Sequence, residues 1–354
     1  MLLAMKEIKR EKLRYSLIIL LVALISYMMF ILSALALGLA HQNMSALDDW
    51  NANSIVLNEQ ADGVMRASVL TSQQVENAQK HTDGDTAAVG FVSTRLITNA
   101  KKKESVNFLG VKKNSFIADR VKLNTGRMPL KSHEIVLDQS VATKAQLAVN
   151  DQITLGNDTA LYTVVGIAHD AKLQIVPVAY GLLSDWHRIS PLAPNIEASA
   201  VVSTKSFSTP ESSLSRFTIS QFIQLLPGYS AQNKTFVMMI AVLAIVTLVI
   251  IAVFLYIIVL QKLPNIAVLK AQGIPTRYLI GSTVEQGSMV VIFGLLIGII
   301  LTVATALPMP ASVPMEFSPL LLSATAVGLV AMGVIGSLLP ARKIATVDPI
   351  ALME

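Results

Sequence analysis

The placement of four long apolar stretches constrains this chain more than any other feature of its sequence. One uncharged run precedes a long polar segment and three follow it: Tyr15–Ala40, then Thr235–Gln261, Gln286–Met315 and Phe317–Ala341. Each is longer than the roughly 20 apolar residues that a helix needs to cross a bilayer core. We therefore predict an α-helical membrane protein with four transmembrane helices, one before and three after a folded domain.

The distribution of Lys and Arg predicts how these helices are oriented. Basic residues gather before the first run, between the second and third, and after the fourth: Lys6, Lys9, Arg10, Lys12, Arg14; Lys262, Lys270, Arg277; Arg342, Lys343. The loop from Pro308 to Pro319 has none. Because basic residues in short loops mark the cytoplasmic side, we expect a multi-pass protein of the cell membrane with both termini cytoplasmic. The net charge of +5 then reflects topology and does not indicate nucleic-acid binding.

These patterns divide the chain into membrane, cytoplasmic and outer segments. Transmembrane helices are expected at 15–42, 233–261, 284–307 and 319–341. The cytoplasmic segments are a basic N-terminal segment, a connecting helix and a tail, at 1–14, 262–280 and 342–354. The outer segments are a large domain at 43–232 and a short loop at 308–318.

The first apolar run has a second interpretation, as a cleavable signal peptide. Ala34-Leu35-Ala36 resembles a small-residue cleavage site. The run is, however, well beyond the roughly 7–15 apolar residues of a signal sequence, so we expect it to be retained as a helix. The chain has no cysteine, so the outer domain has no disulfide and must have its own hydrophobic core.

Short, mostly β-rich patterns fill the polar segment between Asp48 and Ser230, which predicts an α+β extracytoplasmic domain. Alternating or β-branched runs predict strands at Ser54–Leu57, Ala87–Thr98, Ser105–Val111, Glu134–Leu137, Gln152–Leu155 and Leu161–Ile167. Helices are expected at Ser72–His81, with Ser72 as the N-cap, and at Ser140–Leu147. The Ser-, Thr- and Pro-rich segment Ser203–Ser213 is predicted to lie outside the core.

The sequence contains no recognisable catalytic motif. The five His residues are scattered without metal-ligand spacing. A GxxxxGK[ST] phosphate loop is absent, as are GxSxG and HExxH. We therefore expect a protein that is not an enzyme and does not hydrolyse ATP by the phosphate-loop route.

The connection between the second and third apolar runs predicts a short amphipathic helix at the membrane face. Ile266, Leu269 and Gly273 fall on one side of it, with Lys270 turned elsewhere. Gly273 is the expected C-cap, with Pro275 beyond it.

This segment and the C-terminus carry a family resemblance. Asn265-Ile-Ala-Val-Leu-Lys-Ala-Gln-Gly-Ile274 resembles an element of FtsX-like and MacB-type ABC transporter permeases, although the family usually has Glu where this chain has Asn265. Pro340-Ala-Arg-Lys-Ile-Ala-Thr-Val-Asp-Pro-Ile-Ala-Leu352 is similar to their C-terminal element. Further similar stretches lie in the outer domain: Gly126–Pro129, Glu134–Leu137, Val149–Leu155 and Tyr162–Ile167.

The resemblance implies a fold, partners and a cargo. The family's members work as homodimers with two copies of a cytoplasmic ABC ATPase, seated on a coupling helix that here matches Ile266, Leu269, Lys270, Gly273 and Ile274. ATP-driven movement passes by mechanotransmission through the first two helices to the outer domain. The opening Lys6-Glu-Ile-Lys9 and Leu13-Arg-Tyr15 are most similar to heme-regulated transporter permeases of Gram-positive bacteria. That likeness implies an efflux pump that exports heme from the membrane lipid, with heme as substrate and no intrinsic cofactor.

Candidate heme-binding residues follow from this implied cargo, because His, Met and Tyr are common iron ligands. Such residues gather near the outer ends of the first two helices: Met28, Met29, His41, Met44, Trp50, Tyr229 and Met238. Met29, His41 or Tyr229 would ligate the iron. Each has an alternative interpretation: the Met residues as core packing, His41 as an interfacial polar residue, and Trp50 and Tyr229 as aromatic-belt anchors.

Three rival functions stay open from the sequence. The first is a permease of the same type that exports an antimicrobial peptide or another lipophilic compound. The second is an FtsX-like signalling scaffold that controls a cell-wall hydrolase. The third, a membrane-anchored enzyme, is disfavoured because no catalytic motif is present.

Overall fold

The computed structural model describes residues 11–190, 195–208, 212–310 and 313–345. They form two compact units. A membrane unit comprises Met1–Gly38 and Asn233–Glu354, and an α+β domain comprises Leu39–Gln232. Most of the predicted basic N-terminal segment and most of the predicted tail, at 1–10 and 346–354, lie outside the described residues.

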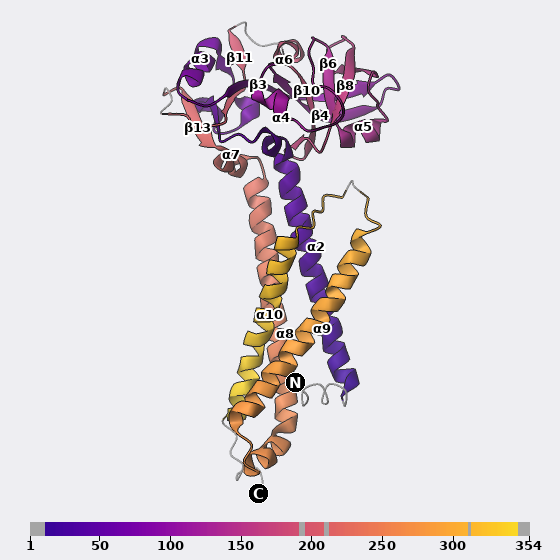
Figure 1. Ribbon diagram of the computed structural model, residues 1–354, viewed down its shortest axis with the longest axis vertical. Helices are drawn as coiled ribbons and strands as arrows, with labels where there is room; N and C mark the ends of the chain where they lie inside the picture. The colour runs from indigo at the N-terminus through magenta and orange to yellow at the C-terminus, as the bar shows by residue number, and fades with distance from the viewer. Residues whose placement is uncertain (1–10, 191–194, 209–211, 311–312, 346–354) are drawn as a thin grey trace. The chain divides into compact units, whose positions relative to one another are not determined.

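The described residues contain the predicted helices, one before and three after most of the α+β domain. The end of the first and the beginning of the second belong to that domain. Their bounds are α2 Lys12–Trp50, α8 Tyr229–Ala271, α9 Thr276–Ala306 and α10 Pro319–Ala345 (Figure 1). Each is long and apolar enough to cross a membrane. The prediction of a four-helix membrane protein is thus confirmed. Helices α2 and α8 extend beyond their runs at both ends, because their polar ends continue the helix. Helix α9 begins before its run and ends at Ala306, ahead of Pro308 and Pro310.

Small residues let α9 pack closely on α2. A Cβ atom built on Gly298 would lie 2.3 Å from Ser26 Oγ and 3.1 Å from the Ala23 carbonyl oxygen. One built on Gly294 would lie 2.7 Å from a methyl group of Val22. Close backbone approach of this kind favours helix association in lipid, where burial of apolar surface gives no driving force between helices.

Polar side chains connect the helices at one end of the membrane unit. The Tyr15 hydroxyl on α2 donates to Gln286 Oε1 on α9 at 3.2 Å. The Arg14 guanidinium donates to Gln261 Oε1 on α8 at 2.5 Å and also forms an ion pair with Glu11. These contacts hold the beginning of α2 to the two other helices.

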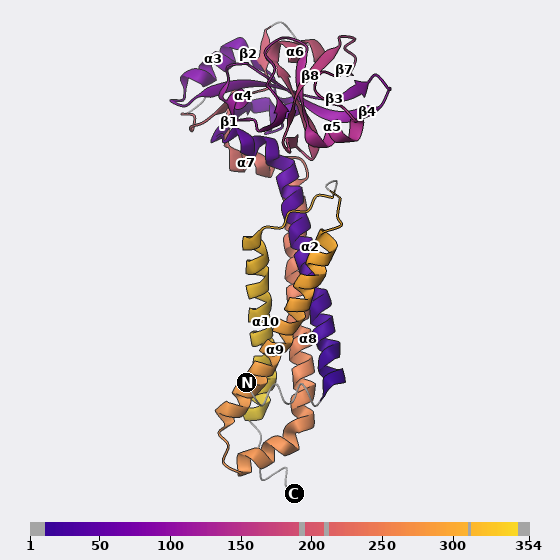
Figure 2. The same ribbon diagram turned by 45° about the vertical axis from the view of Figure 1, so that its right-hand side comes forward.

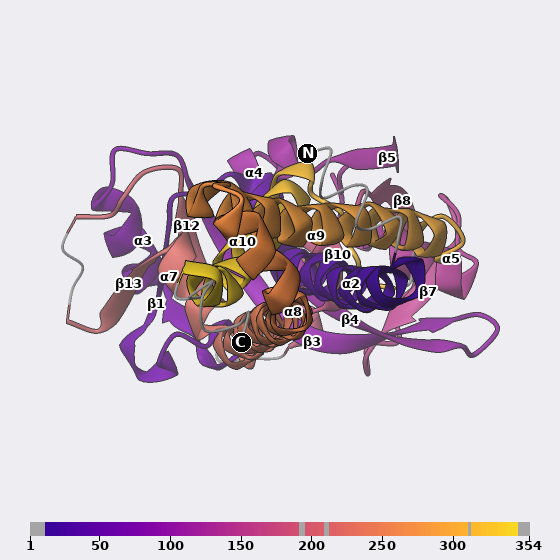
Figure 3. The ribbon, with the colours of Figure 1, turned by 90° about the horizontal axis from the view of Figure 1, so that it is seen from below.

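The α+β domain is built on an eleven-stranded mixed sheet with the order β13-β1-β12-β3-β4-β10-β6-β8-β5, while β7 pairs with β3 and β8, and β9 with β10. A second sheet contains β11 and β2. The strand bounds are β1 Ser54–Asn58, β2 Leu70–Thr71, β3 Thr86–Thr98, β4 Lys103–Val111, β5 Leu123–Gly126, β6 Glu134–Asp138, β7 Gln152–Leu155, β8 Tyr162–Ala168, β9 Lys172–Leu173, β10 Val176–Leu182, β11 Ile196–Ala198, β12 Ala200–Ser203 and β13 Leu214–Thr218. Figure 3 shows the β3–β4 hairpin reaching out beyond the neighbouring strands.

The sheet has a hydrophobic core on each face. Along strands buried on both faces, side chains alternate between the two clusters, as a pleated strand requires. Ile55 and Leu57 belong to one cluster, and Val56 between them belongs to the other. The domain is therefore stabilised by its own core, as the cysteine-free sequence predicts.

Short helices cover this sheet: α3 Ser72–Lys80, α4 Phe116–Arg120, α5 Gln139–Ala145, α6 Leu183–Ile189 and α7 Ile219–Leu225, with single turns η1 Glu59–Ala61 and η2 Met65–Ala67. Both predicted helices are present. The predicted N-cap is wrong by one residue, because Thr71 and not Ser72 caps α3. Thr71 and Gln74 form a reciprocal capping box, which satisfies two N-terminal amides.

The prediction for Ser203–Ser213 is wrong at Phe207. Its ring is fully buried in the core, and the Arg216 guanidinium donates to its carbonyl oxygen. The polar composition around one aromatic residue misled the prediction, because a single buried ring leaves no periodic pattern.

Two glycines opposite each other make room for the largest side chain on α6. Gly90 on β3 pairs directly with Gly110 on β4. A Cβ at Gly90 would lie 2.3 Å from the indole ring of Trp186, and one at Gly110 would lie 2.8 Å from its Cβ. Trp186 thus packs flat on a side-chain-free part of the sheet.

Candidate functional site

The connection between α8 and α9 differs from the predicted separate helix. Helix α8 continues without a break from the membrane-spanning part to Ala271, with Pro264 inside it. Proline removes a helical hydrogen bond and bends the helix, and Figure 2 shows α8 turning near its C-terminal end. The predicted coupling element is therefore the last part of a long helix.

Gly273 ends this helix as expected. Its φ is +87°, a conformation that residues with a Cβ rarely adopt. Its amide donates to the Lys270 carbonyl at 2.9 Å, and the Ile274 amide donates to the Leu269 carbonyl at 3.1 Å. This pair of bonds is a Schellman motif, in which Leu269 and Ile274 make the accompanying apolar contact.

The apolar coupling candidates face inward. Ile266 is buried in a small cluster with Leu279 and Ile344, and Leu269 and Ile274 pack against the same cluster. Lys270 donates from Nζ to the Ile344 carbonyl at 2.7 Å, which links the ends of α8 and α10. These residues hold the connection in shape.

Other side chains of the connection are exposed. Val268 is 45% exposed and Tyr278 is 57% exposed. Asn265, Gln272 and Arg277 are also exposed. We call these five residues the connection face. The sequence analysis did not predict the connection face. It assigned the apolar side of the helix to a partner protein, whereas that side packs against α9 and α10.

The heme candidates on α2 and α8 have very different surroundings. Met28 and Met238 are exposed, whereas Met29 is buried among the helices of the membrane unit. Trp50 is fully buried in the α+β domain, and its Nε1 donates to the Tyr180 hydroxyl at 3.2 Å.

Met44 and Tyr229 are only partly buried, and both pack against the domain core. Among the described residues, no group of three or more His, Asp or Glu side chains is placed to hold a metal ion.

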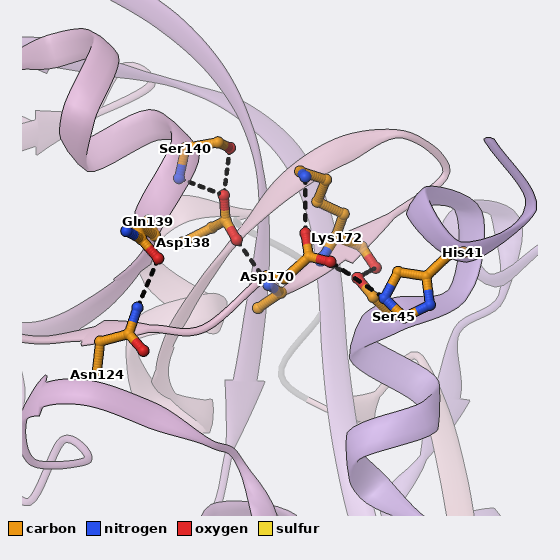
Figure 4. Close-up of polar contacts among 9 residues, drawn as sticks. His41, Ser45, Asn124, Asp138, Gln139, Ser140, Asp170 and Lys172 are labelled. Carbon is orange, nitrogen blue, oxygen red and sulfur yellow. Dashed lines mark hydrogen bonds and ion pairs between the residues drawn. The ribbon is translucent and has the colours of Figure 1, made fainter. Parts of the chain in front are cut away.

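His41 is held by an acidic partner that the sequence did not reveal. Its Nε2 lies 3.1 Å from Asp170 Oδ2, and Lys172 Nζ lies 2.7 Å from Asp170 Oδ1 (Figure 4). The hydrogen bond from His41, together with that from Lys172, holds the pKa of Asp170 well below its usual range. No sequence signal links His41 to Asp170, because the contact depends on the position of the β8–β9 turn.

The same turn contacts α2 through backbone groups. Ser45 Oγ accepts from the Lys172 amide at 2.8 Å and lies 3.3 Å from its carbonyl oxygen. The Gln174 and Ile175 amides donate to the carbonyls of Asn43 and Gln42 at 3.0 and 3.1 Å. Residues 170–175 therefore contact α2 at His41, Gln42, Asn43 and Ser45. We call residues 170–175 the α2 clamp.

A buried carboxylate anchors the α2 clamp to the sheet. Asp138 Oδ2 accepts from the Ala171 amide at 2.6 Å, and Oδ1 accepts from the amide and the hydroxyl of Ser140. Figure 4 shows Asp138 beside the clamp. Burial raises the pKa of Asp138. The last turns of α2 are thus tied to β6 and α5 through the clamp.

Two family models match this arrangement. A model described as MacB-like periplasmic core domain matches residues 16–216, and one described as FtsX-like permease C-terminal matches residues 237–349. The chain belongs to the FtsX-like, MacB-type permease family. The matches confirm the family resemblance predicted from the connection and the α+β domain. The chain is therefore an ABC transporter permease.

Relatives match this FtsX-like permease along nearly its whole length. A putative hemin transport system permease protein HrtB of Staphylococcus epidermidis is 25% identical over 353 residues, covering 98% of this chain and 97% of the relative. The protein of the same name from Staphylococcus haemolyticus is 26% identical over 358 residues, with the same shares covered.

Solved structures match the α+β domain only distantly. The periplasmic region of MacB from Actinobacillus actinomycetemcomitans is 15% identical, with a TM-score of 0.37, covering 50% of this chain and 94% of that one. The extracellular domain of the noncanonic ABC-type transporter YknZ from Gram-positive bacteria is 11% identical, with a TM-score of 0.33, covering 44% of this chain and 83% of that one.

Proposed function

We propose that this permease is the membrane subunit of an ABC-type efflux pump that exports heme and so protects the cell from heme toxicity. The observation that carries the proposal is the similarity, over nearly the whole chain, to proteins named as hemin transport permeases. ATP hydrolysis comes from a separate ATPase subunit, because the sequence has no phosphate loop.

The working unit in this proposal is two permeases with two ATPases. ATP binding closes the ATPase pair and moves the connection between α8 and α9. That movement passes along α2 and α8 to the α+β domain, as a rigid-body switch between two packed states. The scarcity of charged residues within the apolar runs supports this mechanism, because a polar pathway through the bilayer would require them.

The orientation in this proposal has both termini and the connection in the cytoplasm and the α+β domain outside. Because the chain has no cysteine, single cysteines at Thr276 and Ser140 report on opposite sides. We expect a membrane-impermeant thiol reagent to label Ser140→Cys in intact cells and Thr276→Cys only after lysis. Equal labelling of both in intact cells would contradict the orientation.

The ATPase in this proposal docks on the connection face. Val268→Asp together with Tyr278→Asp is expected to reduce co-purification of the ATPase about tenfold or more, because two exposed apolar contacts become charged. Permease yield should stay unchanged, since both side chains are exposed. Leu269→Ala is the matched control. It removes a side chain from the internal cluster, so it should lower thermal stability before it affects docking. Full co-purification of the double variant would place docking elsewhere.

The heme candidates are tested one by one on the purified permease. We expect added heme to give the absorption spectrum of a bound heme, and His41→Ala or Tyr229→Ala to change its Soret band through loss of an iron ligand. Met28→Ala and Met238→Ala should weaken binding. Because Met29 and Trp50 are buried, we assign them to packing, so their variants should lose stability with an unchanged spectrum.

Two outcomes would redirect this proposal. Wild-type spectra and heme tolerance in all four binding variants would show that the site is wrong. No heme spectrum at all, with an ATPase stimulated by another lipophile, would favour export of a peptide or other lipophilic compound. An ATPase insensitive to every lipophile would favour the scaffold.

A further inference from the structure

A gap in the strand pairing leaves a pocket beside β3. One edge of β3 pairs with β4 from Val89 to Ile97. The other edge pairs with β12 up to Val89 and with β7 only from Leu96 onward. Between these neighbours, residues 90–95 have no strand partner on that edge among the described strands. A pocket of about 380 Å³ opens beside this part of β3.

The turn after β7 closes one side of this pocket. The Gly156 amide donates to the Arg95 carbonyl at 2.8 Å. Gly156 has a φ of +60°, and a Cβ there would lie 2.6 Å from Thr94 Oγ1. A glycine is therefore required for the turn to lie this close to β3. The polar residues of the lining that carry the argument are Ser93, Arg95, Lys103 and Asn157.

Two cations line the pocket without a carboxylate to neutralise them. Ile97 pairs directly with Lys103 across the β3–β4 ladder, so Arg95 and Lys103 lie on the same face of the hairpin. Among the described residues neither forms an ion pair. The nearby acids are otherwise engaged: Glu104 binds Lys144 at 2.7 Å, and Asp158 accepts from Ala160 and Tyr162.

Polar groups complete the lining. The Ser93 hydroxyl donates to Asn107 Oδ1 at 2.9 Å, which leaves its oxygen as an acceptor. Asn157 is a further polar residue of the lining. The volume is at the lower end of the roughly 300–1,000 Å³ of small-molecule sites, which fits a compact polar molecule.

We propose that this pocket binds a small phosphate monoester that carries hydroxyl groups, of the size of a sugar phosphate. A phosphate monoester has a charge of about −1.5 to −2 at neutral pH, which matches the two cations. The planar Arg95 guanidinium suits two phosphate oxygens at once, and Lys103 adds a point charge. Ser93, on the same face as Arg95, and Asn157 contact the hydroxyl groups. The site is independent of the transported cargo.

The test is equilibrium binding to the full-length permease in nanodiscs of neutral lipid. Glucose 1-phosphate is expected to bind, inorganic phosphate to bind more weakly, and glucose not to bind. Arg95→Gln with Lys103→Gln should weaken the binding of glucose 1-phosphate about tenfold or more, as expected for the loss of charge-assisted hydrogen bonds. Gly156→Ala should also weaken it, because the turn must move away from Thr94.

The control is Lys101→Gln with Lys102→Gln at the tip of the same hairpin, which removes the same charge outside the pocket lining. It should leave the affinity for glucose 1-phosphate within about twofold of wild type, because salt screens the effect of charges that lie outside the pocket. An equal loss in this control would show diffuse attraction to the hairpin and overturn the pocket. No binding of either phosphate compound, or binding unchanged in the Arg95 and Lys103 variant, would also overturn it.

Discussion

Replacing Gly298 with Leu is expected to destabilise the membrane unit and lower its yield, whereas the same change at Gly328 leaves it intact. Gly298 faces Ser26 and the Ala23 backbone on α2, with no room for even a Cβ. A leucine there must push α2 and α9 apart, and overpacking of a close contact costs about 1–3 kcal/mol or more. Around Gly328 there is no atom within 4 Å of a Cβ position, so it can carry the same side chain.

The measurement is the yield of monodisperse protein from detergent-solubilised membranes, with the melting temperature of what is recovered. We expect Gly298→Leu to lose most of the monodisperse protein and Gly328→Leu to match wild type. Equal behaviour of the two variants would mean that α2 and α9 do not meet at these glycines.

Trp186→Ala is expected to destabilise the α+β domain by about 3–5 kcal/mol, the usual cost of removing a buried indole. The side chain is 1% exposed and fills the space above Gly90 and Gly110. A loss of this size is a large part of the stability of a typical domain. Urea unfolding of the full chain in detergent measures it through the fluorescence of Trp50, because the chain has only two tryptophans.

A second substitution tests whether the glycine pair exists to accommodate this ring. Gly90→Leu alone should destabilise the domain, because its side chain collides with Trp186. Combined with Trp186→Ala, the leucine fills part of the vacated space, so the double variant should be more stable than the two single losses predict. Leu161→Ala, at a 51% exposed position, is the control and should change little. Additive losses, or a stable Trp186→Ala variant, would contradict the packing described here.

Local patterns in the sequence were sufficient to predict the membrane helices and half of the sheet. An uncharged run of this length forms an α-helix in lipid, because every backbone N–H and C=O group must be hydrogen-bonded within the segment. Strands such as β3 and β8 were recognisable as apolar, β-branched runs, since their side chains enter a core on each face of the sheet. The Thr71 cap was missed by one residue because Ser72 also favours caps, and only the capping-box geometry decides between them.

Long-range pairing was the part that the sequence could not reveal. Strand β10 lies between β4 and β6, parallel to one and antiparallel to the other, yet Pro177 interrupts its pattern. Strand β1 pairs with β12 and β13 near the other end of the domain. Pairings so distant in sequence depend on the whole topology, and no local propensity encodes them.

The candidate site was predictable in kind but not in detail. The amphipathic pattern located the connection and its Gly273 cap correctly. It could not tell that Ile266 and Leu269 pack against α9 and α10, because an apolar stripe looks the same whether its partner is internal or a separate protein. His41 was recognisable as a polar residue near the end of a helix. Its partner Asp170 was not, because a turn far along the chain delivers it.

The α2 clamp determines which kinds of force the last turns of α2 can deliver to the sheet. A pull along the helix axis loads the His41–Asp170 pair, the two Ser45 contacts and the two backbone bonds together. All of these contacts would resist such a pull at the same time. An axial displacement of α2 would therefore have to break all of these contacts at once, which makes the clamp the stiffest connection described here between this helix end and the sheet.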